Sequence, residues 1–130
     1  MDIPAQSKTE ETSFLVSCNG SCEGIDIKVK GNPYRTEVEL FALEEEKPTI
    51  DIDDASCVEC ENFCSSRNTQ TYRSEKTCEN LSTSSDRFFV TVYARYSHED
   101  LTITFSGGNI LNITQIGKKF EKYFINMLCT

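Results

Sequence analysis

The chain has 130 residues, which suits one domain that is large enough to bury a hydrophobic core. Its formal net charge is −8, and an acidic chain repels nucleic acid and anionic lipid, so we expect neither as a partner. The sequence has no run of about 20 apolar residues, so we expect membrane attachment only through parts of a longer chain.

The first third of the chain predicts a polar lead followed by three β-strands. Residues 1–12 are polar and predict a linker. SFLVS at 13–17 and the alternating GIDIKVK at 24–30 predict the two strands of a hairpin, because a tight turn separates them. RTEVELFAL at 35–43 contains helix-favouring residues, but its alternation predicts a third strand.

From residue 44 to residue 81 the alternation breaks down, and four of the seven cysteines lie in this segment. Such a cysteine density is typical of an oxidising compartment and of a segment held by disulfides. Six cysteines are candidates for disulfide bonds: Cys18, Cys22, Cys57, Cys60, Cys64 and Cys78. Cys18 and Cys22 straddle a tight turn and can bridge, whereas the other four allow three pairings and Cys129 is left over.

Residues 86–105, DRFFVTVYARYSHEDLTITF, carry the clearest pattern, which predicts two antiparallel strands joined by a loop at 97–100. We expect their buried face to consist of Phe88, Val90, Val92, Leu101, Ile103 and Phe105. A last strand follows at 109–113, and residues 117–130 form an atypical tail whose apolar spacing fits a short helix. The chain therefore predicts an all-β fold: residues 13–116 as a single antiparallel, jelly-roll-like β-sandwich, stapled by disulfides.

If those residues build the core, a second set of side chains faces away from it. This set is Phe41, Phe89, Tyr93 and Arg95. Aromatic residues and an arginine on an exposed sheet face are typical of a recognition patch. The alternative is that the cysteine-rich segment folds over this face and buries it.

Metal binding and catalysis find little support in the sequence. The spacing C-x-x-C-x-x-x-C at 57–64 resembles a zinc site but lacks the second pair of a zinc motif. Asp51, Asp53 and Asp54 are a minimal candidate for calcium that fails the EF-hand pattern. His98, the single histidine, has no nucleophile placed to use it, and no GxSxG motif is present. We expect a protein that is not an enzyme and has no cofactor.

Three N-x-Ser/Thr sequons agree with passage through the secretory pathway, and their asparagines, Asn19, Asn80 and Asn112, are candidates for glycosylation. Residues 1–4 do not begin a signal peptide, so we expect a secretory chain of this kind to be a piece of a longer protein. The predicted location is extracellular or in the endolysosomal lumen.

Four segments of the sequence occur in an order that is typical of a known family. They are TEVELFA at 36–42, KPT at 47–49 before a cysteine-bearing loop, DRFFVTVY at 86–93 and DLTITF at 100–105. In this order, over residues 13–114, the chain resembles the bacterial pre-peptidase C-terminal domain family. Glu37 and Glu39 stand where that family has aspartates, and Asp86-Arg87 replaces its usual Gly-Thr.

This resemblance implies a jelly-roll-like β-sandwich without catalytic activity. Domains of the family accompany secreted proteases and occur in protozoan receptors that sort hydrolases to lysosomes. We therefore expect a non-catalytic binding module that recognises a protein or glycoprotein cargo, such as a hydrolase or protease. The alternatives are a structural spacer in a larger secreted protein, a lectin-like carbohydrate-binding module and a zinc-dependent interaction domain.

Overall fold

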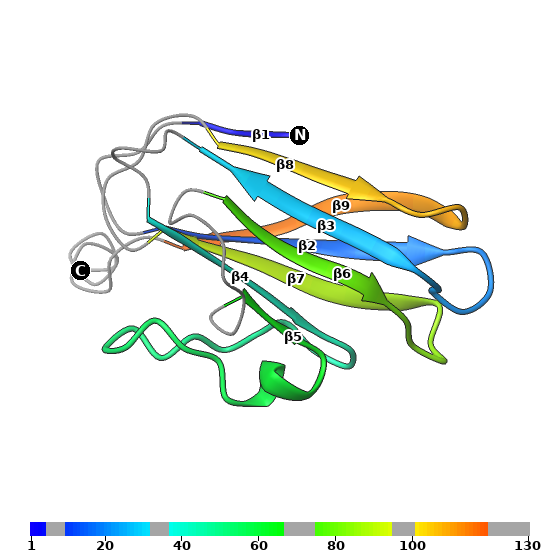
Figure 1. Ribbon diagram of the computed structural model, residues 1–130, viewed down its shortest axis with the longest axis horizontal. Helices are drawn as coiled ribbons and strands as arrows, with labels where there is room; N and C mark the ends of the chain where they lie inside the picture. Colours follow the sequence, from blue (N-terminus) through cyan, green and yellow to red (C-terminus); the bar gives the residue numbers. More distant parts are fainter. Residues whose placement is uncertain (5–9, 32–36, 67–74, 95–100, 120–130) are drawn as a thin grey trace, which may run out of the picture.

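The computed structural model describes residues 1–4, 10–31, 37–66, 75–94 and 101–119. Within these ranges nine strands form two antiparallel sheets that face each other (Figure 1). The four-stranded sheet has the order β1 (Asp2–Ile3), β8 (Leu101–Ser106), β3 (Ile25–Lys30), β6 (Glu75–Leu81). The five-stranded sheet has the order β5 (Cys64–Ser65), β4 (Val38–Leu43), β7 (Arg87–Ala94), β2 (Glu10–Cys18), β9 (Ile110–Lys119).

The predicted all-β sandwich is therefore confirmed. The described ranges include a 3₁₀ turn, η1 (Glu59–Asn62), and no α-helix. Nothing in those ranges forms an apolar helix long enough to cross a bilayer.

The main core lies between the two sheets and follows from the alternation of the strands. In β3, Ile25, Ile27 and Val29 are buried while the residues between them are exposed, as a half-buried strand requires. Five of the six predicted core residues of β7 and β8 are buried as expected. The sixth, Phe105, is partly buried and packs edge-on against Phe14, with ring centroids 5.7 Å apart.

The two predicted hairpins are wrong. β7 pairs with β2 and β4, whereas β8 pairs with β1 and β3 in the opposite sheet. β2 and β3, which flank the first turn, also belong to different sheets. Strands of opposite sheets face the same core, so they show the same alternation as two strands of a hairpin.

The sandwich extends beyond the bounds expected from the sequence. The short strand β1 pairs with β8, and the amide of Ile103 donates to the carbonyl of Met1 at 2.8 Å. β2 begins at Glu10, whose buried carboxylate accepts a hydrogen bond from Thr12 at 2.8 Å and lies 3.3 Å from the Lys118 ammonium. β9 continues to Lys119, beyond the expected last strand. The rest of the predicted tail, residues 120–130, lies outside the described residues.

Three disulfides staple the sandwich, and their presence confirms the prediction. They join Cys18 to Cys22, Cys57 to Cys60 and Cys64 to Cys78, with Cα–Cα distances of 5.3, 5.3 and 6.0 Å. The first two close short loops. The third joins β5 of one sheet to β6 of the other and is therefore a covalent bond between the layers. Cys129, expected to remain unpaired, lies outside the described residues.

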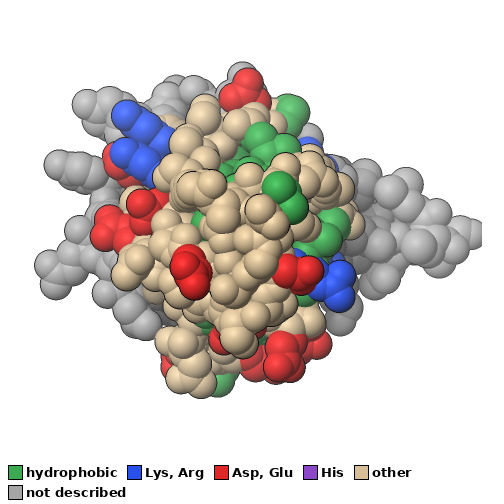
Figure 2. Space-filling view, turned by 90° about the vertical axis from the view of Figure 1, so that its right-hand side faces the viewer, with side chains coloured by type: hydrophobic (Ala, Val, Ile, Leu, Met, Phe, Trp, Pro, Cys, Tyr) green, Lys and Arg blue, Asp and Glu red, His purple; other side chains and the backbone are tan. Residues whose placement is uncertain are grey.

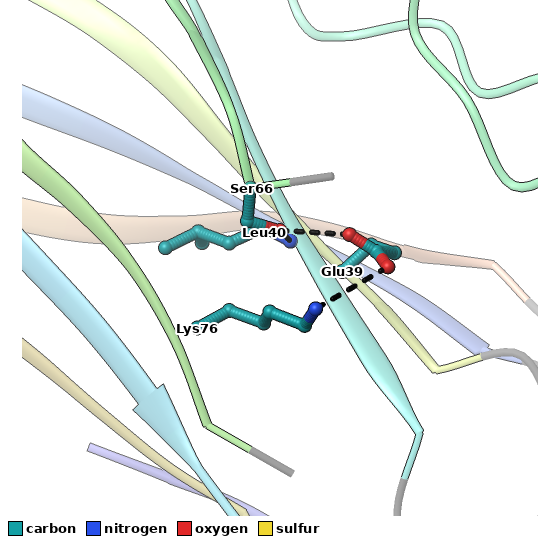
Figure 3. A network of polar contacts seen from close by, with 4 residues as sticks. All are labelled: Glu39, Leu40, Ser66 and Lys76. Atoms are coloured by element: carbon teal, nitrogen blue, oxygen red, sulfur yellow. Dashed lines mark hydrogen bonds and ion pairs between the residues drawn. The ribbon is translucent and has the colours of Figure 1, made fainter. Parts of the chain in front are cut away.

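A polar network connects the sheets at the same edge of the sandwich (Figure 3). The ammonium of Lys76 on β6 lies 3.8 Å from the carboxylate of Glu39 on β4. Ser66 donates to Glu39 at 2.8 Å and accepts the backbone N–H of Leu40 at 2.7 Å. The buried lysine and serine thus have polar partners, as buried polar groups require.

Replacing both Cys64 and Cys78 by alanine should lower the free energy of unfolding by about 3 kcal/mol, because the bond closes a loop with a sequence separation of 14. The matched control, alanine at Cys18 and Cys22, opens a loop with a separation of 4 and should cost about 2 kcal/mol. Denaturant unfolding of both variants measures the difference. An equal or larger loss in the control would contradict the role of the bond between the sheets.

Val92→Asp should abolish cooperative folding, because Val92 is 2% exposed in the main core and an aspartate there would be a buried, unpaired charge. Thr104→Asp is the control: Thr104 is exposed and lies opposite Lys28, so stability should change by no more than about 0.5 kcal/mol. Thermal melts followed by circular dichroism distinguish the two. A cooperative melt of the Val92→Asp protein would show that the assignment of the core face is wrong.

Candidate functional site

The aromatic sheet face expected to be exposed is buried for the most part. Phe41 is 0% exposed and Tyr93 is 2% exposed, so their assignment to an exposed patch is wrong. Phe89 is half-buried, and Arg95 lies outside the described residues. The alternative expectation holds, because part of the cysteine-rich segment packs over this outer face of the five-stranded sheet.

We call this covering part, residues 44–63, the acidic segment. A second hydrophobic cluster joins it to the sheet and consists of Phe41, Tyr93, Ile50, Ala55, Cys57 and Cys60. The segment follows β4 and runs along the lower side of the sandwich in Figure 1. Its Lys47 ammonium lies 3.9 Å from where a Cβ on Gly117 of β9 would stand, so the segment reaches across to the far edge of the sheet.

Local hydrogen bonds shape the acidic segment. Asp51 and Ser56 form an isolated antiparallel bridge, with N–H···O distances of 2.7 and 3.2 Å. The turn between them contains Ala55 in a left-handed backbone conformation with φ 55°, and its side chain is buried. The Cys57–Cys60 disulfide and η1 follow directly. The segment is thus fixed by buried anchors, a bridge and a covalent bond.

The exposed side of the acidic segment combines negative charge with two apolar side chains. It carries eight carboxylates, all exposed, and one lysine, a net charge of −7 compared with −8 for the whole chain. In Figure 2 acidic side chains gather along the lower edge of the molecule. Val58 is 75% exposed and Ile52 is 51% exposed, which makes Val58 the most exposed large apolar side chain among the described residues.

Strand periodicity in the sequence does not indicate Ile52 and Val58, because neither residue belongs to a strand. The available signal was compositional. The acidic segment contains single apolar residues between its carboxylates, and few of its residues can reach the sheet. Some of these apolar side chains must therefore be exposed.

In the described ranges no group of three His, Cys, Asp or Glu side chains is arranged to hold a metal ion. Cys57 and Cys60 are bonded to each other, and a disulfide sulfur is not the thiolate that zinc requires. Asp51 accepts the backbone N–H of Asp53 at 3.0 Å, and Asp54 accepts the hydroxyl of Ser56, so two of the proposed calcium ligands cap their own turn. His98 lies outside the described residues.

The depressions on the described surface include two that differ in charge. One, of about 470 Å³, lies on the outer face of the four-stranded sheet and is lined by Lys28, Lys30, Gly31, Thr102 and Thr104. The ammonium of Lys28 is 2.7 Å from the carboxylate of Glu75, and this hydrogen bond lowers the pKa of Glu75 below its usual value. Lys28 of this groove therefore already has an anionic partner.

The second depression, of about 520 Å³, lies among the loops at one end of the sandwich. Its lining is almost uncharged and consists of Asn19, Gly20, Ser21, Glu23, Gly108 and Asn109. The amide group of Asn109 donates to the carbonyls of Asn19 and Ser21, so this side chain ties two loops together. In this depression the hydroxyl of Ser21 donates to the carboxylate of Glu23 at 3.4 Å, which is longer than the contact of about 2.6–3.2 Å that joins a nucleophile to its base.

A scan against models of known protein families finds no match, and no curated protein matches the chain at a significant level. The resemblance to pre-peptidase C-terminal domains therefore stays a prediction from the sequence.

Tyr93→Ala should lower the free energy of unfolding by about 3 kcal/mol, because it removes a large side chain from the cluster beneath the acidic segment. Leu111→Ala is the control: Leu111 is 68% exposed on β9, and its truncation should change stability by no more than about 0.5 kcal/mol. Urea unfolding measures both. A Tyr93→Ala protein as stable as the control would restore the exposed-patch hypothesis.

Proposed function

We propose that the protein is a non-catalytic binding module which recognises a protein partner through the acidic segment. The observation that carries the proposal is the exposure of Val58 and Ile52 on a segment that is otherwise fixed to the sheet. Exposed apolar side chains held in one conformation provide the contact energy of an interface, while surrounding polar groups exclude water from its rim.

The stapling of the segment supports binding in a second way. A loop that orders only on association loses conformational entropy, which weakens the complex. Here the Cys57–Cys60 disulfide and the buried Ile50 and Ala55 order the segment in advance. The apolar side chains are therefore presented with little entropic cost on binding.

The charge of the segment defines the chemistry of the partner. Eight exposed carboxylates attract a basic surface, increase its association rate and disfavour acidic proteins. The partner that fits is a basic protein or glycoprotein, and the resemblance noted above suggests a hydrolase or protease as cargo. Three disulfides are consistent with an oxidising environment. We place the complex in the extracellular space or the endolysosomal lumen.

The experiment compares three immobilised proteins: the parent chain, the double variant Ile52→Ser with Val58→Ser, and Leu111→Ala. Secreted and lumenal proteins retained by the parent are identified and the affinity of each is measured. The double variant should lose at least tenfold in affinity, because two interface contacts of this kind contribute more than about 1.4 kcal/mol. Leu111→Ala truncates a similarly exposed apolar side chain on β9 and should bind like the parent.

Salt provides the second readout. Raising the ionic strength from 0.1 to 1 M shortens the screening length from about 10 to about 3 Å and should weaken the complex. Equal binding by the double variant and the parent would exclude the acidic segment as the recognition element. If the parent retains no protein at all, the chain is a spacer, and retention that requires only a free glycan would indicate a lectin.

A further inference from the structure

The two sheets of the sandwich have unequal edges. In the described part of the chain each sheet has one edge strand of only two residues, β1 or β5, and one long edge strand, β6 or β9. A long edge strand exposes unpaired backbone N–H and C=O groups, on which another chain can add a strand. Short edge strands avoid this hazard, so protection is required at β6 and β9.

β9 is the edge with the least protection of its own. From Ile110 to Gly117 its eight residues, ILNITQIG, include no charged residue and no proline. Leu111 and Ile116 are exposed, and each is skipped by the pairing with β2, where the register shifts. An uncharged, β-branched edge with exposed apolar residues is a typical site of edge-to-edge association. By contrast, β6 includes Glu75, Lys76 and Glu79.

A sequon lies in the middle of this unprotected stretch. Asn112 is exposed on β9 and lies opposite Ser17 of β2. Its side-chain nitrogen donates to the hydroxyl of Thr114, the third residue of the same sequon, at 3.0 Å. Both side chains therefore project from one exposed face of the edge strand, and a large group on the Asn112 nitrogen meets no core residue.

We propose that Asn112 carries an N-linked glycan which protects β9 from pairing with a second chain. The amide nitrogen attacks C1 of an oligosaccharide carried on a polyisoprenoid diphosphate. The N–C1 bond forms, the C1–O bond to the diphosphate breaks, the nitrogen loses one proton and the lipid diphosphate leaves, with no change in oxidation state. The inference rests on the secretory location in the proposed function but not on any partner of the acidic segment.

The other two sequons provide internal comparisons. Asn80 lies on β6 at a bulge, with φ 54° and its backbone N–H donating to Asp26 at 2.8 Å. A glycan on Asn80 would lie on β6, an edge strand that charged residues already protect from pairing. Asn19 is exposed in the turn after β2, where its N–H donates to the carbonyl of Asn109 at 2.8 Å, and it belongs to no strand. Its glycan would leave both edges unchanged.

The experiment uses the full chain, directed into the secretory pathway of eukaryotic cells by an added leader. Site-resolved mass spectrometry before and after treatment with peptide N-glycosidase should show a glycan on Asn112. Light scattering over a concentration series should show the parent as a monomer and Asn112→Gln as a dimer or larger species. Ser21→Ala, which removes the Asn19 sequon, should lose one glycan and stay monomeric. Asn80→Gly, which suits the left-handed backbone, should stay monomeric too.

A measurement on the glycosylated parent keeps the proposal falsifiable if Asn112→Gln misfolds. Trimming the glycans of the folded parent to a single N-acetylglucosamine with an endoglycosidase, which leaves the Asn112 amide uncharged, should produce the same association. Adding Leu111→Lys to Asn112→Gln should restore the monomer, because a charge on an edge strand opposes pairing as the glycan does. An unmodified Asn112 in secreted parent, or a trimmed protein as monomeric as Ser21→Ala, would overturn the proposal. Each result is read without a binding partner, so it stands apart from the test of the acidic segment.

Discussion

The bond between Cys64 and Cys78 is the constraint on which the arrangement of the molecule depends. It joins β5 to β6, and therefore one sheet to the other, at the edge where Lys76 and Glu39 also meet. The acidic segment lies between β4 and β5, so the bond fixes the strand that ends the segment. A single cross-link thus holds two layers together and keeps a third element on the outer face of the five-stranded sheet.

That third element makes the two sheets unlike each other. The central strands of the five-stranded sheet are buried on both faces, because the second cluster covers Phe41 and Tyr93. The outer face of the four-stranded sheet carries charged and hydroxyl side chains around Lys28 and Lys30. Apart from Met1, the exposed large apolar side chains of the described residues therefore lie on the acidic segment and on β9. Both surfaces lie on the five-stranded side, and they differ in charge.

This difference separates the roles that we assign to the two surfaces. The acidic segment presents Val58 and Ile52 within a field of negative charge that selects basic partners and opposes contact between two copies of the chain. The uncharged part of β9 has no such selectivity, because backbone groups of an edge strand pair with any extended chain. Specific recognition suits the first surface and protection suits the second.

The sequence by itself indicated the strands that show a period of two, such as IDIKVK, because that period is a local property. It did not indicate β6, which lies in the segment where the alternation breaks down. It also indicated the disulfide between Cys18 and Cys22, whose spacing brings them together. Only the tertiary structure decided that β7 and β8 belong to opposite sheets, since alternation is the same for either partner. It also decided the pairing of the remaining cysteines and the burial of Tyr93, because both depend on distances between residues far apart in the chain.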